Sequence, residues 1–150
     1  MDTLAKLKDL CSRRECCRKE VFEKALSQGC SQTEADKIVE TLVEQKFVDD
    51  RRYAEAFVRD KLRFNKWGKI KIVYILRSQD IDRKIIDDIL SEIDYKQYKE
   101  ILRHELEKKY KSGVQGSIYE IKGKLFRFAT SKGFESYVVG EEISQLLSKK

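Results

Sequence analysis

The feature of this sequence that most restricts its fold is an internal repeat. Shifting the chain by 51 residues, and then by a further 53, places apolar residues on apolar residues in three copies. The aligned sets are Phe22, Ala25, Cys30, Val39 and Leu42; Val73, Leu76, Ile81, Leu90 and Ile93; and Phe126, Ala129, Phe134, Ile143 and Leu146. A turn-compatible residue (Gly29, Asp80 or Gly133) precedes the third position of each set. Self-similarity at a nearly fixed period is typical of tandem structural units, so we expect three copies of one unit.

The spacing within each copy predicts helices rather than strands. In the first copy, Val21, Phe22, Ala25 and Leu26 recur at the positions that share one helix face. Gly29 follows as a candidate for a positive φ at the helix end, and the segment 31–34 reads as a capping box that opens the next helix. A further helix is expected before each such pair, at about residues 3–14, 49–65 and 95–111. The prediction is an all-α fold of nine helices.

The repeat also predicts the domain organisation. We expect three tandem three-helix repeats over residues 1–47, 48–94 and 95–150, with Gly113 and Gly116 marking a loop in the third. Hydrophobic residues make up 41% of the chain and charged residues 39%, a balance that favours thin helical layers over one thick core. Units that pack mainly on their neighbours form an elongated, curved helical array.

The helix expected at residues 49–65 and the segment behind it carry the candidate binding residues. Tyr53, Phe57 and Phe64 share one side and are expected to be core anchors, and Asp49 or Asp50 is expected to cap the helix. The candidates for binding a partner or nucleic acid are Arg52, Arg59, Arg63, Lys66, Trp67, Lys69 and Lys71. A cationic stripe of this kind can follow phosphates or an acidic protein surface. A merely solvated face is the alternative explanation.

Nothing in the sequence indicates an enzyme, a metal site or a cofactor. The four cysteines lack the paired spacing of a zinc site, and the one histidine, His104, lies far from them. We therefore expect the cysteines to be small buried hydrophobic residues. No apolar run approaches the length that spans a bilayer, and the start of the chain does not resemble a secretory signal. The expectation is a cytoplasmic monomer that does not contact membranes.

Three segments together resemble the central signature of the RecX family. They are Phe47-Val48-Asp49-Asp50-Arg51-Arg52-Tyr53-Ala54, Lys66-Trp67-Gly68-Lys69 and Ile75-Leu76-Arg77-Ser78-Gln79-Asp80-Ile81. Residues 26–30 and 129–134 resemble the first and third repeats of that family. Asp80 departs from the glycine usual in the family before the turn anchor, and aspartate adopts the left-handed conformation only at some cost.

The resemblance implies a regulator that binds the RecA recombinase, chiefly as the RecA filament on single-stranded DNA. Members of the family inhibit the recombinase and ATPase activities of RecA in DNA repair and the SOS response. The resemblance carries over no individual contact residue, and direct contact with single-stranded DNA stays open. The alternative is a direct DNA-binding protein whose repeats resemble helix-turn-helix units. Against it, four acids of the first copy would face phosphates: Glu34, Asp36, Glu40 and Glu44.

Overall fold

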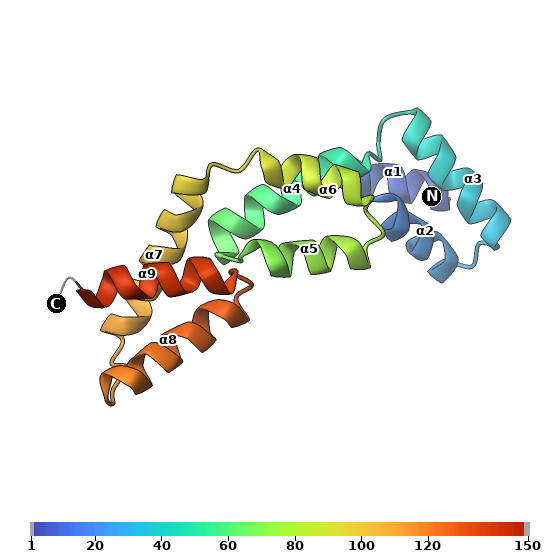
Figure 1. The fold of residues 1–150 in the computed structure, drawn as a ribbon. Coiled ribbons are helices and arrows are strands. Elements are labelled where there is room, and N and C mark those ends of the chain that lie inside the picture. Colours follow the sequence, from blue (N-terminus) through green and yellow to red (C-terminus); the bar gives the residue numbers. More distant parts are fainter. Residues whose placement is uncertain (1, 149–150) are drawn as a thin grey trace. The chain divides into compact units, whose positions relative to one another are not determined.

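The computed structural model describes residues 2–148, and this part of the chain contains helices and loops but no β-strand. The elements, labelled in Figure 1, are α1 (Thr3–Arg13), α2 (Arg18–Ser27), α3 (Gln32–Glu44), α4 (Asp50–Asp60), the π-helix η1 (Lys61–Asn65), α5 (Lys69–Ser78), α6 (Arg83–Ser91), α7 (Tyr95–Lys111), α8 (Ile118–Ser131) and α9 (Ser136–Ser148). The all-α prediction is confirmed. Within the described residues, no helix is long and apolar enough to cross a membrane.

The helix ends follow the local sequence signals. Gly29 has φ +97° two residues after the end of α2, and Gly133 has the same value two residues after the end of α8. At the start of α3, Ser31 Oγ accepts from the Glu34 amide at 3.1 Å, while Glu34 Oε1 accepts from the Ser31 amide at 3.0 Å. Asp80 takes the corresponding left-handed position in the middle of the chain, with φ +57°. These observations confirm the predicted turns and the predicted capping box.

The chain forms two compact units. The first comprises the chain up to Phe57 together with residues 76–87, and the second comprises residues 58–75 and the chain from Asp88 onward. Each unit therefore takes part of the segment 48–94. The division into three repeats over 1–47, 48–94 and 95–150 stays a prediction.

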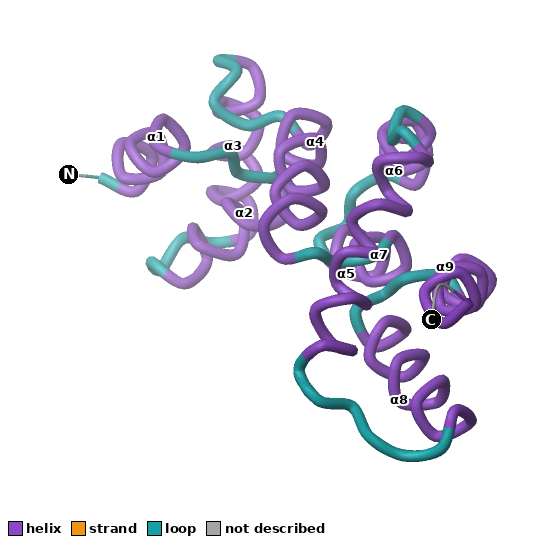
Figure 2. The backbone as a smooth tube through the Cα atoms, turned by 90° about the vertical axis from the view of Figure 1, so that its left-hand side faces the viewer, coloured by secondary structure: helices purple, strands orange, loops and turns teal. Residues whose placement is uncertain are grey.

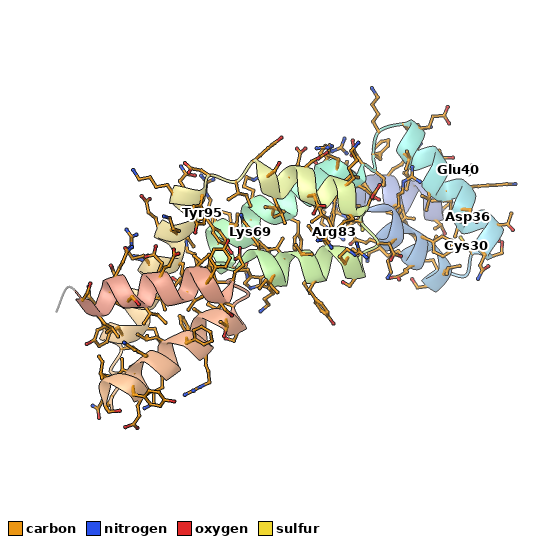
Figure 3. The ribbon with its side chains drawn as sticks, in the orientation of Figure 1. Cys30, Asp36, Glu40, Lys69, Arg83 and Tyr95 are labelled. Atoms are coloured by element: carbon orange, nitrogen blue, oxygen red, sulfur yellow. The ribbon has the colours of Figure 1, made fainter. Side chains whose placement is uncertain are left out.

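The core of the first unit is formed by α1, α2 and α3. Its buried members are Leu7, Cys11, Cys16, Val21, Ala25, Ala35, Val39, Leu42 and Val48. Cys17 is also buried, whereas Cys30 is half-buried at the turn between α2 and α3, where Figure 3 labels it. Burial raises the pKa of the Cys16 thiol well above its usual value. The prediction that the cysteines act as small hydrophobic residues is therefore confirmed for the three buried ones.

In the second unit, α7, α8 and α9 pack against one another, as Figure 2 shows. The rings of Tyr98 and Phe134 meet at a centroid distance of 5.3 Å in its core. Two carboxylates are also buried there. Glu142 on α9 is only 1% exposed and accepts two bonds of 3.1 Å from the guanidinium of Arg103 on α7. Because a buried carboxylate is stable only when paired, this contact fixes α7 against α9.

The second buried carboxylate, Glu105 on α7, accepts from Lys132 Nζ at 2.8 Å. Burial acts to raise the pKa of Glu105, but Lys132 and Lys108 outweigh it, so the net pKa lies below the ordinary value. Lys132 follows α8 directly, so this ion pair joins α7 to the turn between α8 and α9.

The helix predicted over residues 49–65 is interrupted by the π-helix. The α-helical part, α4, ends at Asp60, and η1 continues to Asn65 before Lys66 turns left-handed with φ +56°. A π-turn accommodates an extra residue, which rotates the following side chains by roughly 100° relative to a straight α-helix. Leu62 is consequently buried, while Phe64 is 72% exposed, so the prediction that Phe64 is a core anchor is wrong. Tyr53 and Phe57 are half-buried and stack at 6.0 Å.

Candidate binding interface

A backbone clamp positions the turn that carries Lys66, Trp67 and Lys69. The Gly68 amide donates to the Lys132 carbonyl at 2.7 Å, and the Ile70 amide donates to the Gly133 carbonyl at 2.9 Å. Between them, the Lys69 amide donates to the hydroxyl of Tyr98 at 2.9 Å. The first amides of a helix have no partner within it. Here α7 and the turn between α8 and α9 supply the acceptors for the start of α5.

Only glycine fits at the two closest points of this clamp. A Cβ on Gly68 would lie 2.2 Å from the Phe134 nitrogen, and a Cβ on Gly133 would lie 2.4 Å from Lys71 Cβ. Real Cβ atoms essentially never approach other atoms within 3.0 Å. The glycine pair therefore allows the two backbones to touch.

Tyr98 links the clamp to the core of the second unit. Its hydroxyl accepts from the Lys69 amide and donates to the carboxylate of Glu135. Burial and the bond to Glu135 both raise the pKa of Tyr98 far above its usual value. The hydroxyl of Tyr98 thus stays protonated and donates its hydrogen bond to Glu135. The Lys69 ammonium lies over the Tyr98 ring at 4.8 Å from the centroid.

Two further lysines gather at Trp67, which is half-buried at the junction of η1 and α5. Lys71 Nζ lies 4.4 Å and Lys61 Nζ 4.8 Å from a ring centroid of the indole. Contacts of this kind contribute roughly 0.5–1 kcal/mol each at exposed sites. They hold Lys61 and Lys71 on the surface formed by Trp67.

Three of the predicted binding residues come together in one groove of the second unit. Arg59, Arg63 and Lys66 line a space of about 530 Å³ together with residues of α7 and the segment before it. We call this the basic groove; its other lining residues are Leu62, Ile93, Gln97, Tyr98, Glu100, Ile101 and His104. Glu100 is the one carboxylate among them. Arg59 also contacts Asp60 at 3.5 Å. The groove carries an excess of positive charge on an accessible surface.

Arg52 is held elsewhere. It belongs to the first unit, where its Nε donates to Glu15 Oε1 at 2.7 Å and its Nη2 donates to the Lys46 carbonyl at 3.1 Å. The bond to Glu15 raises the pKa of Arg52. These contacts tie the segments after α1 and after α3 to α4. The binding role of Arg52 stays a prediction, and its guanidinium has a structural role that the sequence does not reveal.

The acidic pair before Arg52 is also structural. Asp49 Oδ1 accepts from the Arg52 amide at 3.1 Å, which caps α4 as predicted. Asp50 Oδ1 accepts from the Arg18 amide at 2.9 Å and so caps α2 instead. Within residues 2–148, no three histidine, cysteine, aspartate or glutamate side chains form a group that could hold a metal ion.

Comparison with known proteins places these features in a family. The model of the second three-helix domain of RecX matches residues 49–90. Regulatory protein RecX of Chlorobium phaeobacteroides (strain BS1) is 32% identical over 139 residues, which cover 91% of this chain and 88% of that protein. The chain belongs to the RecX family. Regulatory protein RecX of Clostridium tetani is 33% identical over 133 residues, covering 87% of this chain and 59% of that protein. The chain spans about three fifths of the length of its clostridial RecX relatives.

Solved RecX structures show the same fold. A crystal structure of RecX from Lactobacillus salivarius matches with a TM-score of 0.79 at 24% identity and covers 97% of both chains. A crystal structure of another regulatory protein RecX matches with a TM-score of 0.84 at 24% identity, covering 96% of this chain and 74% of the other. The RecX signature of this chain thus acquires structural meaning: Asp49 and Asp50 cap two different helices, and Gly68 permits the backbone clamp.

Proposed function

We propose that this chain is a cytoplasmic regulatory protein that binds RecA, chiefly as the RecA filament on single-stranded DNA. We further propose that it inhibits the recombinase and ATPase activities of that filament during DNA repair, without catalysing a reaction itself. Its membership of the RecX family supports the regulatory role, because the related proteins carry the name regulatory protein RecX. The observation that carries the contact surface is the basic groove, where Arg59, Arg63 and Lys66 converge.

The charge of the basic groove suits a filament that presents acidic side chains and DNA phosphates. Guanidinium groups bind carboxylates and phosphates through two parallel hydrogen bonds, which fixes orientation as well as charge. A single exposed ion pair contributes only about 0.2–1 kcal/mol, so one cation would give little affinity. Several ion pairs together bind more tightly than one. The three cations of the groove, and the adjoining Trp67, Lys69 and Lys71, therefore form a surface that can bind an anionic partner.

A charge reversal of the basic groove tests this proposal. The variant Arg59→Glu, Arg63→Glu, Lys66→Glu is compared with a control, Lys6→Glu, Lys24→Glu, Lys37→Glu, that reverses three exposed lysines of the first unit. Each reversal removes one positive charge and adds one negative charge, so both triples take the formal net charge from +6 to 0. RecA is assembled on single-stranded DNA, and its ATP hydrolysis is followed as each protein is added.

The groove variant is expected to need at least about tenfold more protein for half-inhibition, which corresponds to about 1.4 kcal/mol of lost binding. The control is expected to stay within about twofold of the parent, since its charges lie outside the groove. Equal losses in both variants would show that overall charge, and not the groove, mediates binding. If the parent protein leaves ATP hydrolysis unchanged at saturation, the proposed function itself is refuted.

Direct binding of duplex DNA through α2 and α3 is the weaker alternative. A helix-turn-helix presents its second helix to the DNA. On α3, four acids are exposed, and Figure 3 shows two of them, Asp36 and Glu40, projecting from the helix. Carboxylates at these positions repel phosphates. Specific binding of this chain to duplex DNA without RecA would favour the alternative.

A further inference from the structure

A second groove lies between α8 and α9 and shares no lining residue with the basic groove. It encloses about 560 Å³. We call it the α8–α9 groove, and its apolar walls are Tyr119, Phe126 and Ile143. Gly123 of α8 and Gly140 of α9 also line it. The whole groove is formed within the second unit.

The two glycines of this groove have no structural reason to be glycine. Neither has a positive φ, and a Cβ on Gly140 would meet nothing within 4 Å. A Cβ on Gly123 would meet only the guanidinium of Arg127, the flexible end of a side chain, at 3.3 Å. Glycine inside a helix lowers its stability relative to alanine. Gly68 and Gly133 lie outside the helices and permit a close backbone contact, whereas Gly123 and Gly140 leave open space in the groove.

Apolar side chains around this space are exposed to solvent. Tyr119, a lining residue at the start of α8, is 82% exposed. Phe126, in the groove itself, is 38% exposed. Gathered apolar side chains beside a concave surface are characteristic of protein interaction sites, and aromatic residues are enriched in such sites.

The charges that line the α8–α9 groove are mostly positive. Lys122, Lys124 and Arg127 all come from α8. Lys124 Nζ donates to the Gln115 carbonyl at 2.7 Å, so it also holds the loop before α8. The one acid among the lining residues, Glu120, accepts from the Ser117 amide at 3.2 Å as part of a capping box. The groove therefore combines apolar walls with three cations and a single acid.

We propose that the α8–α9 groove binds an acidic amphipathic helix of a partner protein. The apolar face of that helix enters the space over Gly123 and Gly140, and its carboxylates pair with Lys122 and Arg127. Binding of an amphipathic helix in an apolar groove is a recurrent mode of peptide recognition. A peptide fits better than a nucleic acid because the interior of the groove offers apolar contact beside its cations. This inference goes beyond the proposed function and does not depend on it.

The test uses the full chain and three fluorescent probes. The first is a synthetic amphipathic helix with leucine and phenylalanine on one face and glutamate on the other. The second replaces each glutamate by glutamine, and the third is a single-stranded thymidine oligonucleotide. Fluorescence anisotropy is expected to show that the acidic peptide binds at least about tenfold more tightly than the other two probes. Amide chemical shifts are expected to change in α8 and α9.

Two variants locate the binding. Gly140→Leu fills open space, so the chain stays folded while the affinity for the acidic peptide falls at least about tenfold. Gly140→Ala, which adds only a methyl group, is its matched control and retains affinity. Lys122→Glu with Arg127→Glu reverses two cations of the groove, and Lys6→Glu with Lys24→Glu is the control for net charge. The double variant Lys122→Glu, Arg127→Glu is expected to lose the preference for the acidic peptide over the neutral one. The control Lys6→Glu, Lys24→Glu is expected to keep that preference.

Several results would overturn the inference. Equal binding of the acidic and neutral peptides would remove the role of the cations. Undiminished binding by Gly140→Leu would place the peptide elsewhere. Tighter binding of the oligonucleotide, lost in Gly140→Leu, would identify a nucleic-acid site, and self-association lost in the same variant would assign the groove to a second copy of this chain. Because inhibition of RecA is not the readout, failure here leaves the proposed function untouched.

Discussion

Replacing Gly68 by alanine tests the backbone clamp directly. The new Cβ would lie 2.2 Å from the Phe134 nitrogen, so reaching the 3.0 Å that real contacts respect requires a displacement of about 0.8 Å. A shift of that size breaks or weakens the bonds from the Gly68 amide to Lys132 and from the Ile70 amide to Gly133, now 2.7 and 2.9 Å long. Losing a buried hydrogen bond costs about 1–2 kcal/mol, so the two together cost about 2–4 kcal/mol.

An opposing effect reduces this loss. Gly68 does not have a positive φ, so alanine can adopt its backbone conformation, and the smaller entropy of the unfolded chain then stabilises by about 0.4–1 kcal/mol. The net expectation for Gly68→Ala is a decrease of about 2 kcal/mol in the free energy of unfolding. For a chain of this size, that corresponds to a Tm about 4–8 °C lower.

Urea denaturation followed by far-UV circular dichroism measures this change, and hydrogen exchange at residues 68 and 70 locates it. Both amides are expected to lose protection. Gly140→Ala is the matched control, since a Cβ there meets nothing within 4 Å, and it is expected to gain about 0.5–1 kcal/mol. If Gly68→Ala is as stable as Gly140→Ala, the close approach of the two backbones does not contribute to stability and the reasoning is wrong.

Three further perturbations have defined outcomes. Lys132→Met leaves the buried carboxylate of Glu105 without its closest cation and is expected to cost about 1–3 kcal/mol at neutral pH. Pairing lowers the net pKa of Glu105 in the folded parent, so the stability that the ion pair adds is present above the unfolded pKa and disappears as pH falls through the folded pKa. The difference in free energy of unfolding between parent and variant, measured by urea denaturation, should therefore become smaller on acidification. A difference that does not change with pH would contradict this. Asp80→Gly relieves a left-handed aspartate with φ +57° and is expected to raise the free energy of unfolding by about 1 kcal/mol in thermal melts; an unchanged or lower Tm would count against that strain. In the folded protein, Cys30 is expected to react with a thiol reagent before the three buried cysteines, Cys11, Cys16 and Cys17. Reaction of all four at the same rate would disprove the burial of those three.

The parts of the fold that sequence reasoning predicted well depend on neighbouring residues. The turn at Gly29 and the capping box at the start of α3 involve partners within a few positions, so their chemistry is visible in the sequence. A second capping box, from Ser117 to Glu120, has the same spacing of serine and glutamate. The π-helix η1 has no comparable sequence signal. For that reason the helical spacing predicts a buried Phe64, whereas the structure exposes it.

The candidate site was predictable in composition but not in arrangement. The spacing of Arg59, Arg63 and Lys66 suggested a shared surface, and the structure brings them into one groove. The sequence pattern could not show that the guanidinium of Arg52 bonds to Glu15, 37 positions earlier. Nor could it show that Tyr98 bonds to the start of α5, since that pairing depends on how α7 packs. Interactions between distant segments depend on packing that no local pattern encodes.

The clamp at Gly68 has a consequence for the order in which the protein is made. Lys132 lies 64 positions after Gly68, so the acceptors for the start of α5 leave the ribosome long after α5 itself. A fragment cut at residues 49–90, which the model of the second three-helix domain of RecX matches, would contain α5 without Tyr98, Lys132 or Gly133. Its first amides would then be left to water, and the lysines on that turn would lose their fixed positions. The middle segment of this RecX chain is thus a unit of sequence whose folding is completed by residues made later.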